Sequence, residues 1–291
     1  MMSKVAVMTD TISAITKEIA DEHNIKLMSL YIGKEGTSKR ETEINLAWFY
    51  EQLPKWRETD KLPTSSSVTT ADFLEAYREL SQKAEAILYV AHSSKLGMSP
   101  KVALQAKGMA KDELPSTPIE VIDSSTACGA QMLIAIEAAR AAAAGKSFPQ
   151  VVDAANDMVK RVTFVPLYDD LYYLMKGGRI HKGRVWAGSQ ISNTAIMEMN
   201  VSTGGEHKPL ARCRTKAQTL ERLFEIVKER SGDKKLHVVI NHADVPPEAE
   251  ELRELALSKF HCAEVYITPL LPVVTLHTGL GTRAFSWWSE D

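Results

Sequence analysis

A histidine, a threonine and two glycines form the group of residues best suited to bind a ligand, and they follow an apolar run near the end of the chain. The run covers residues 270–275, and His277, Thr278, Gly279 and Gly281 come after it. Glycine lets a ligand approach the backbone closely, and imidazole can donate or accept a hydrogen bond. The group indicates a ligand-binding loop after a buried strand, although a histidine that only satisfies its neighbours would give the same pattern.

Clusters of hydroxyl side chains also stand in the first half of the chain. They are residues 64–67, 93–94 and 124–126, and the last two follow apolar runs at 87–91 and 119–122. A helix needs only one hydroxyl as its N-cap, so the surplus at 64–67 favours an anion or a carboxylate held at a helix N-terminus. Simple helix capping is the alternative.

The alternation of strand-like and helix-like segments predicts an α/β protein with a parallel sheet in its first half. Strands are expected at 5–8, 26–32, 87–91 and 119–122, and residues 33–60 are irregular apart from a short helix at 46–53. Strands expected at 195–201, 207–214, 236–240, 265–267 and 273–276 predict a mixed sheet in the second half. We therefore expect two domains, residues 1–160 and 161–291, with a ligand beyond the carboxyl ends of the parallel strands.

The composition narrows the class of protein. The chain has 291 residues, 44% hydrophobic and 25% charged, with a formal net charge of -2. Because Lys and Arg are not in excess, nucleic acid is not an expected partner. Three scattered cysteines, an apolar tract at 132–144 that charges interrupt, and a start without a signal-peptide pattern predict a cytoplasmic protein that does not span a membrane.

In their order and rough spacing, these loops resemble the motifs of the DegV family. The matching stretches are residues 9–13, 63–65, 93–96, 121–124, 171–180 and 277–279. The run Leu-Tyr-Tyr-Leu-Met-Lys-Gly-Gly-Arg-Ile at 171–180 is similar to the most distinctive motif of the family, and His277-Thr278-Gly279 is similar to its last. The resemblance covers essentially the whole chain, and these two motifs are specific in combination.

The resemblance implies a bacterial fatty-acid-binding protein with a long-chain fatty acid buried between two α/β domains. The ligand-binding residues that it implies are Thr64, Ser65, Ser93, Ser94, His277 and Thr278. Arg179 and Arg212 match arginines at the rim, where lipid or partner is met, although an ordinary solvated charge would also explain Arg212. The implied partner is a fatty acid kinase that supplies ATP and phosphorylates the carboxyl group, and a transient contact with a membrane surface is compatible with this role. No cofactor, metal or catalytic residue is implied.

Three positions depart from the family pattern. Residues 96–99 are Leu-Gly-Met-Ser where Leu-Ser-Gly-Thr is usual, Thr194-Ala195 replaces Lys-Pro, and Leu280 replaces proline. These changes predict an unchanged fold with altered head-group contacts or a different acyl chain.

The two ends of a fatty acid contribute differently to its binding free energy. Burying hydrocarbon is worth about 0.8 kcal/mol per methylene, whereas a neutral hydrogen bond contributes about 0.5–1.5 kcal/mol net. The tail should therefore set the affinity, while the hydroxyls and His277 orient the carboxyl group. Such neutral donors would hold the head group without a fixed cation beside it.

A serine hydrolase is the alternative function, with Ser94, His277 and either Asp10 or Asp123 as a triad. The chain has no GxSxG motif, and a sequence does not show the hydrogen-bonded order that a triad needs.

Nucleotide and metal sites are not expected. The GxGxxA pattern at 279–284 is followed by only seven residues, too few for the helix that gives this motif its meaning, and no phosphate-binding loop motif occurs. His92, His242 and His277 lack the spacing of metal ligands.

Overall fold

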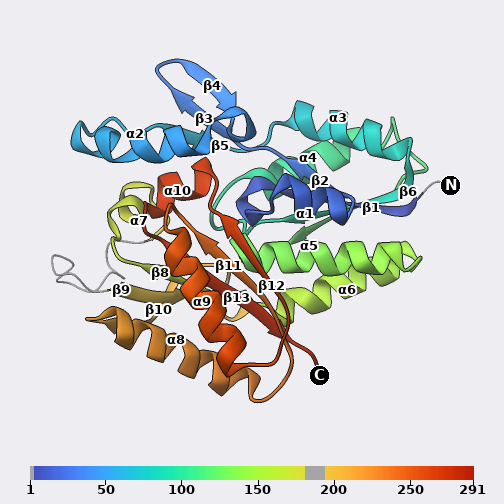
Figure 1. Ribbon diagram of the computed structural model, residues 1–291. Coiled ribbons are helices and arrows are strands. Elements are labelled where there is room, and N and C mark those ends of the chain that lie inside the picture. Colours follow the sequence, from blue (N-terminus) through green and yellow to red (C-terminus); the bar gives the residue numbers. More distant parts are fainter. Residues whose placement is uncertain (1–2, 181–193) are drawn as a thin grey trace.

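The computed structural model describes residues 3–180 and 194–291, and most of them belong to two sheets with helices around them (Figure 1). The first sheet is parallel, as predicted, with strands in the order β2-β1-β6-β7. These strands are β1 (Ser3–Asp10), β2 (Ile25–Met28), β6 (Ala84–Ala91) and β7 (Ile119–Asp123). Nearly all of β6 is buried, which explains why apolar and polar residues do not alternate along it.

Helices and short 3-10 turns follow the strands of this sheet. They are η1 (Thr11–Ser13), α1 (Lys17–Glu22), α3 (Thr70–Ser81), α4 (Ser99–Ala110), α5 (Cys128–Ala143) and α6 (Phe148–Arg161). Ser147 and Gln150 form a capping box at the start of α6.

The second sheet is mixed, with the order β10-β9-β8-β13-β11-β12. Only β11 and β12 run parallel among its neighbouring pairs. The strands are β8 (Thr163–Tyr168), β9 (Thr194–Glu198), β10 (Lys208–Cys213), β11 (Leu236–His242), β12 (Cys262–Pro269) and β13 (Arg283–Ser289). The other elements of this half are α7 (Tyr172–Lys176), η4 (Val201–Thr203), α8 (Lys216–Ser231), α9 (Pro246–Lys259) and α10 (Pro272–Thr278).

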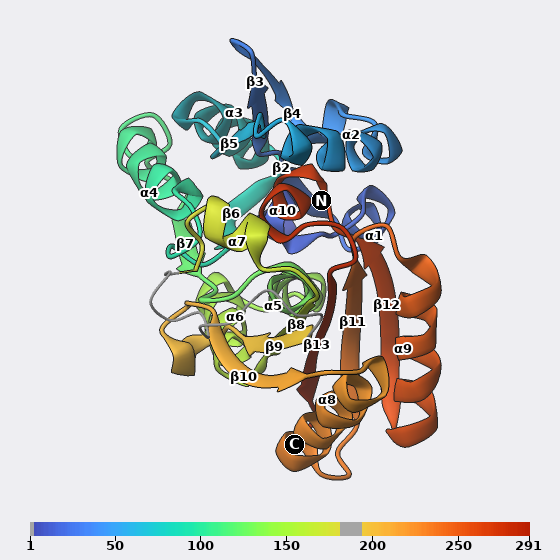
Figure 2. The ribbon, with the colours of Figure 1, turned by 90° about the vertical axis from the view of Figure 1, so that its left-hand side faces the viewer.

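Helix α5 lies between the two sheets and contacts both, reaching β1 on one side and β8, β11 and β13 on the other (Figures 1 and 2). Its alanine-rich sequence is buried along almost its whole length. At its start, the backbone N–H of Gly129 donates to Oδ1 of Asn241 on β11 over 2.9 Å. Because a helix of the first half packs on the second sheet, the division into residues 1–160 and 161–291 stays a prediction.

A small antiparallel sheet, in the order β4-β3-β5, was not expected from the sequence. Its strands are β3 (Tyr31–Lys34), β4 (Thr37–Arg40) and β5 (Thr64–Ser66), accompanied by η2 (Glu41–Glu43) and α2 (Leu46–Glu58). Every residue of β4 is exposed, so this strand has none of the apolar alternation that predicts strands. Strand β5 contains the first three residues of the hydroxyl cluster at 64–67, so the cluster begins in a strand and not in a helix cap.

The strand predicted at 273–276 was wrong, because these residues belong to helix α10. A short apolar run fits a strand or a buried helix equally well, and Pro272 suits the first turn of a helix. The helix packs against α7 and α2 (Figure 2). Strand β13 instead pairs with both β8 and β11, and no strand was predicted from the sequence at its residues. Among the described residues, no helix combines the length and apolar character needed to cross a bilayer.

Candidate ligand-binding site

A cavity of about 350 Å³ is lined by residues from both halves of the chain. Its wall is mainly apolar, with contributions from Ile12, Leu30, Phe164, Leu174, Val273 and Val274. Polar side chains interrupt this wall at a few points: Ser65, Ser66, Ser67, His92, Tyr168, Arg179, His207, His277 and Thr278. An apolar pocket with a small number of polar groups is the usual form of a small-molecule site.

Ser65 and His277 form a hydrogen-bonded pair in this wall. Ser65 Oγ lies 2.7 Å from His277 Nε2, and the two residues come from β5 and the last turn of α10. Burial, together with the positive charge of Arg179, lowers the pKa of His277 to about 3. The imidazole is therefore neutral at physiological pH, with one nitrogen that donates and one that accepts.

Arg179, which the family resemblance implies to lie at the rim, lines the same cavity. Its Nη1 donates to the carbonyl of Gly177 over 2.5 Å and its Nε to the carbonyl of Leu96 over 3.3 Å. Burial lowers the pKa of this guanidinium. No ion pair joins Arg179 to a carboxylate within residues 3–180 and 194–291. The cavity wall therefore contains a cation, which the expectation of a head-group site made of neutral donors did not include.

Three predicted ligand residues do not line the cavity. Thr64 is exposed and donates to the carbonyl of Gly33 over 3.3 Å, because neighbouring side chains of a strand point to opposite faces. Ser93 is buried, but its Oγ donates to the carbonyl of Gly205 over 2.8 Å. Ser94 is exposed, and its backbone N–H donates to Oδ2 of Asp123 over 3.2 Å. Of the hydroxyl residues predicted as ligands, only Ser65 and Thr278 line the cavity, together with Ser66 and Ser67 from the cluster at 64–67.

Thr278 lines the cavity, although its hydroxyl donates to the carbonyl of Val274 one turn earlier in α10. Arg212 lies in β10, where it pairs with Ala195 of β9, and it does not line the cavity. The structure therefore brings together Ser65, Arg179, His277 and Thr278 out of the eight residues predicted.

Two hydrogen-bonded pairs at the cavity were missed as site residues, and of these His92, Tyr168 and His207 line the wall. The carboxylate of Asp10 lies 2.9 Å from Nδ1 of His92, and it also accepts hydrogen bonds from Tyr89 and Gln131. Burial raises the pKa of Asp10, but the attraction of His92 and these hydrogen bonds lower it more, so the carboxyl stays ionised. Tyr168 and His207 form the second pair. The only sequence signal for His207 was its place after the Gly204-Gly205 turn.

The predicted hydrolase triad does not assemble. His277 is paired with Ser65, Asp10 with His92, and Asp123 with the backbone of Ser94. Ser94 does not line the cavity that holds His277. The hydrogen-bonded order that serine catalysis requires is therefore missing from the residues proposed for it.

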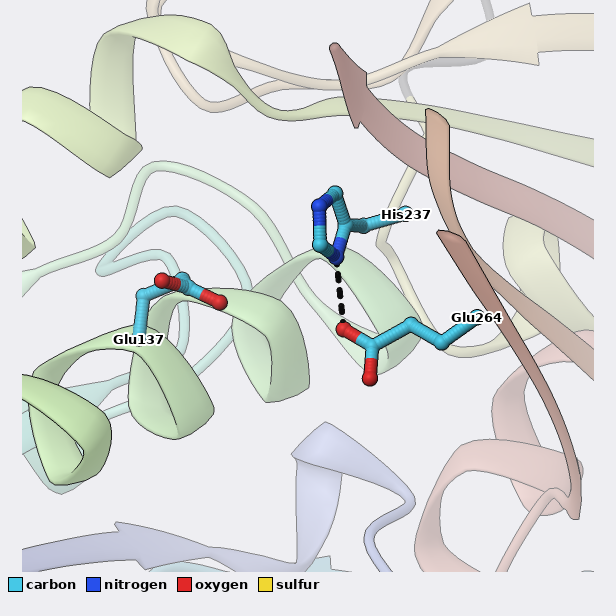
Figure 3. A group of neighbouring side chains, drawn as sticks. All are labelled: Glu137, His237 and Glu264. Atoms are coloured by element: carbon cyan, nitrogen blue, oxygen red, sulfur yellow. Dashed lines mark hydrogen bonds and ion pairs between the residues drawn. The ribbon is translucent and has the colours of Figure 1, made fainter. Parts of the chain in front are cut away.

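Glu137, His237 and Glu264 place their ligand-type atoms within 4.8 Å of one another (Figure 3). Arg140 forms ion pairs with both carboxylates of this group. Its Nη1 lies 2.6 Å from Glu137 Oε1, and its Nη2 lies 2.6 Å from Glu264 Oε2. His237 Nδ1 lies 2.7 Å from Glu264 Oε1, and its ring stacks on Trp288. Although burial raises the pKa of Glu264, hydrogen bonds from Arg140 and His237 lower it to about 2. The group is an ion-paired network that ties α5 to the second sheet.

Two packed sheets with a mainly apolar cavity that has a few polar groups in its wall are typical of α/β proteins that bind small molecules. The family model described as "Uncharacterised protein, DegV family" matches residues 4–290. The chain belongs to the DegV family.

Relatives and solved structures are similar over nearly the full chain. A DegV domain-containing protein of Streptococcus pyogenes serotype M1 is 28% identical over 278 residues, which is 96% of each chain. DegV of Bacillus subtilis, a fatty acid binding protein, superposes with a TM-score of 0.85 at 25% identity and 100% coverage of both chains. A DegV family protein of Eubacterium eligens loaded with heptadecanoic acid gives a TM-score of 0.84 at 16% identity, covering 98% of this chain and 100% of its own.

Proposed function

We propose that this protein binds a long-chain fatty acid in the cavity, with the carboxylate beside Ser65, His277 and Arg179. The observation that carries the proposal is that this neutral hydrogen-bonding pair and this half-buried cation share one mainly apolar cavity. Arg179 and His277 both contact Gly177, which places the guanidinium on the same side of the cavity as the imidazole. A carboxylate suits such a position, because charge-assisted hydrogen bonds from Arg are roughly twice as strong as neutral ones.

The apolar part of the wall supports the acyl half of the proposal. Phe164, Leu174 and Val274 line the cavity, and each methylene buried against such groups contributes about 0.8 kcal/mol. The fatty acid bound by DegV of Bacillus subtilis and the heptadecanoic acid in the Eubacterium eligens protein are consistent with the same ligand class here.

The role we propose for the bound acid is presentation to a separate kinase in the cytoplasm. In that reaction a carboxylate oxygen attacks the γ-phosphorus of ATP, the bond to the β-phosphate oxygen breaks, and an acyl phosphate and ADP form. Ser65, His277 and Arg179 hold the carboxylate in one orientation for the attack, and the kinase supplies the nucleotide. The protein itself is a carrier rather than an enzyme.

The proposal is tested by extracting the purified protein with organic solvent and identifying what is released by mass spectrometry. We expect a long-chain fatty acid in a ratio near one per chain. A clean extract from a protein that also fails to bind added fatty acid would overturn the proposal, and turnover of a chromogenic acyl ester would favour the hydrolase.

Neighbouring residues of β5 provide a matched pair of variants for the head-group site. Ser65→Ala removes the hydroxyl that contacts His277, whereas Thr64→Ala removes one that faces away from the cavity. The loss of one hydrogen bond should weaken fatty acid binding about two- to tenfold in Ser65→Ala. Thr64→Ala should bind like the unmodified protein, and equal losses in both variants would contradict the assigned site.

A further inference from the structure

Arg57, in the last turn of α2, holds the start of α7. Its Nη1 forms an ion pair with Asp170, and its guanidinium carbon lies 4.3 Å from the ring centroid of Tyr172 and 5.3 Å from that of Tyr173. A cation over an aromatic face is attracted electrostatically. Asp170 Oδ1 in turn accepts from the backbone N–H of Tyr172 over 2.8 Å. One side chain of α2 therefore contacts both the residue that caps α7 and the first turn of that helix.

Asp60, two residues beyond the end of α2, holds the other end of α7. Its Oδ1 lies 2.6 Å from Nζ of Lys176, the last residue of α7, and 3.3 Å from the hydroxyl of Tyr172. Helix α7 has only five residues, too few for a helix to be stable on its own. Its position therefore depends on contacts of this kind with the elements around it.

The end of α7 leads directly into the head-group site. The backbone N–H of Gly177 donates to the carbonyl of Tyr173 over 2.8 Å, and the N–H of Arg179 donates to the carbonyl of Leu174 over 3.0 Å. The residues Leu174 and Arg179 both line the cavity. A displacement of α7 would therefore displace the guanidinium that we assign to the carboxylate.

Helix α7 also contacts the end of α10, which carries His277. A Cβ on Gly177 would lie 2.5 Å from His277 Nδ1, and a Cβ on Gly279 would lie 2.5 Å from Cδ2 of Tyr173. The ring of Tyr173 thus contacts Gly279 as well as Arg57. Because α10 packs against both α2 and α7 (Figure 2), the position of the imidazole depends on the same contacts as that of Arg179.

The contacts of Arg57 are suited to placing α7 rather than to stabilising the fold. The side chains of Arg57 and Asp170 are 41% and 42% exposed, and an ion pair of this exposure adds little to the free energy of unfolding. By contrast, hydrogen bonds from the half-buried Arg179 to a carboxylate depend steeply on distance and angle. Loss of Arg57 should therefore affect ligand binding more than it affects stability.

We infer that Arg57 is a positioning residue of the head-group site, which places Arg179 and His277 through α7. The inference rests on the proposed function. It goes beyond that function by assigning part of the selectivity for a carboxylate to a side chain that does not line the cavity. Asp60 supports the same role at the other end of α7.

The test compares octadecanoic acid with octadecanamide in binding titrations on the full-length protein. The two ligands share a tail and have head groups of similar shape, so the ratio of their affinities reports on recognition of the charged head group. Arg57→Ala should lower this ratio about two- to tenfold, since a charge-assisted hydrogen bond is weakened, with little change in thermal unfolding. Arg78→Ala is the matched control, because Arg78 forms an exposed ion pair with Glu113 and does not line the cavity. It should leave the ratio unchanged.

Asp170→Asn is a second variant that tests the same contact from α7. It keeps an oxygen for the backbone N–H of Tyr172 and removes the charge that Arg57 contacts, so it should also lower the ratio. A ratio that neither substitution lowers, or equal losses for both ligands, would overturn the inference and leave fatty acid binding standing. An unmodified protein without preference for the acid would overturn the inference together with the head-group site. If neither ligand binds, the proposed function itself fails.

Discussion

Gly177 lies directly against the imidazole of His277: a Cβ built on Gly177 would stand 2.5 Å from Nδ1. This contact and the hydrogen bond from Ser65 hold the ring from two sides. The φ of Gly177 is -75°, which any residue adopts, so glycine is needed here for space rather than for backbone conformation. The second glycine of the Gly-Gly-Arg-Ile motif, Gly178, differs in having a φ of +70° and open space around it.

Gly177→Ala should therefore displace His277 and weaken fatty acid binding without unfolding the protein. A methyl group at this position must push the imidazole away from Ser65, and the loss of that hydrogen bond should cost up to about tenfold in affinity. Binding titration together with thermal unfolding measures both effects. Gly108→Ala, at a glycine of α4 with nothing within 4 Å, is the control. Unchanged affinity in Gly177→Ala would show that the position of the ring does not matter.

Glu41 should make the stability of the protein depend on pH near neutrality. Its carboxyl is fully buried between Thr11, with which it is hydrogen-bonded, and the backbone N–H of Val273 in the first turn of α10, which donates to Oε2 over 2.8 Å. Burial raises the pKa of Glu41 from 4.5 to about 7. Between these values the unfolded chain has released the proton and the folded chain keeps it, so stability falls as pH rises from about 4.5 to about 7.

Glu41→Gln removes this titration and should flatten that part of the pH profile. The contribution at stake is at most about 3.5 kcal/mol, from about 1.4 kcal/mol per pKa unit. Denaturant unfolding at several pH values measures it as the difference between the two proteins. A difference that stays constant from pH 5 to pH 8 would contradict a raised pKa at Glu41.

Gly129 should be among the least replaceable residues of the interface between α5 and the second sheet. A Cβ on it would lie 2.7 Å from Val239 Cβ and 2.8 Å from Ser286 Oγ, on two neighbouring strands. Gly129→Ala should destabilise the fold by about 1–3 kcal/mol, as overpacking of a core does. Alanine in place of Gly108, by contrast, should stabilise α4 by about 0.5–1 kcal/mol. The measurement is the free energy of unfolding of both variants. A Gly129→Ala variant as stable as Gly108→Ala would show that α5 does not pack this closely against the second sheet.

The group of Glu137, His237 and Glu264 should not respond to metal ions. Arg140 neutralises both carboxylates, and a divalent ion would have to displace it. Thermal unfolding in excess zinc or in a chelator should therefore give the same midpoint as in plain buffer. A midpoint that rises with zinc concentration would indicate a metal site that Arg140 does not block.

Local pattern was enough to predict the parallel sheet and the alternation of strands with helices, because buried strands and amphipathic helices have characteristic apolar spacing. It was not enough for residues 273–276, where an apolar run of this length fits a strand or a helix, or for β4, whose side chains are all exposed. Of the predicted site residues, Ser65 and His277 meet, whereas Ser93 is used to hold Gly205, 112 residues away in sequence. Such a long-range partner has no local signal, and neither does the burial that leaves His207 neutral.

The central claim is that a fatty acid carboxylate lies beside Ser65 and His277. It is tested most directly by nuclear magnetic resonance of a long-chain fatty acid labelled at its carboxyl carbon and bound to the protein. The bound carboxyl signal should differ from that of the free acid, shift in Ser65→Ala, and stay in place in Thr64→Ala. A bound signal that neither substitution moves, or no bound signal at all, would contradict the account.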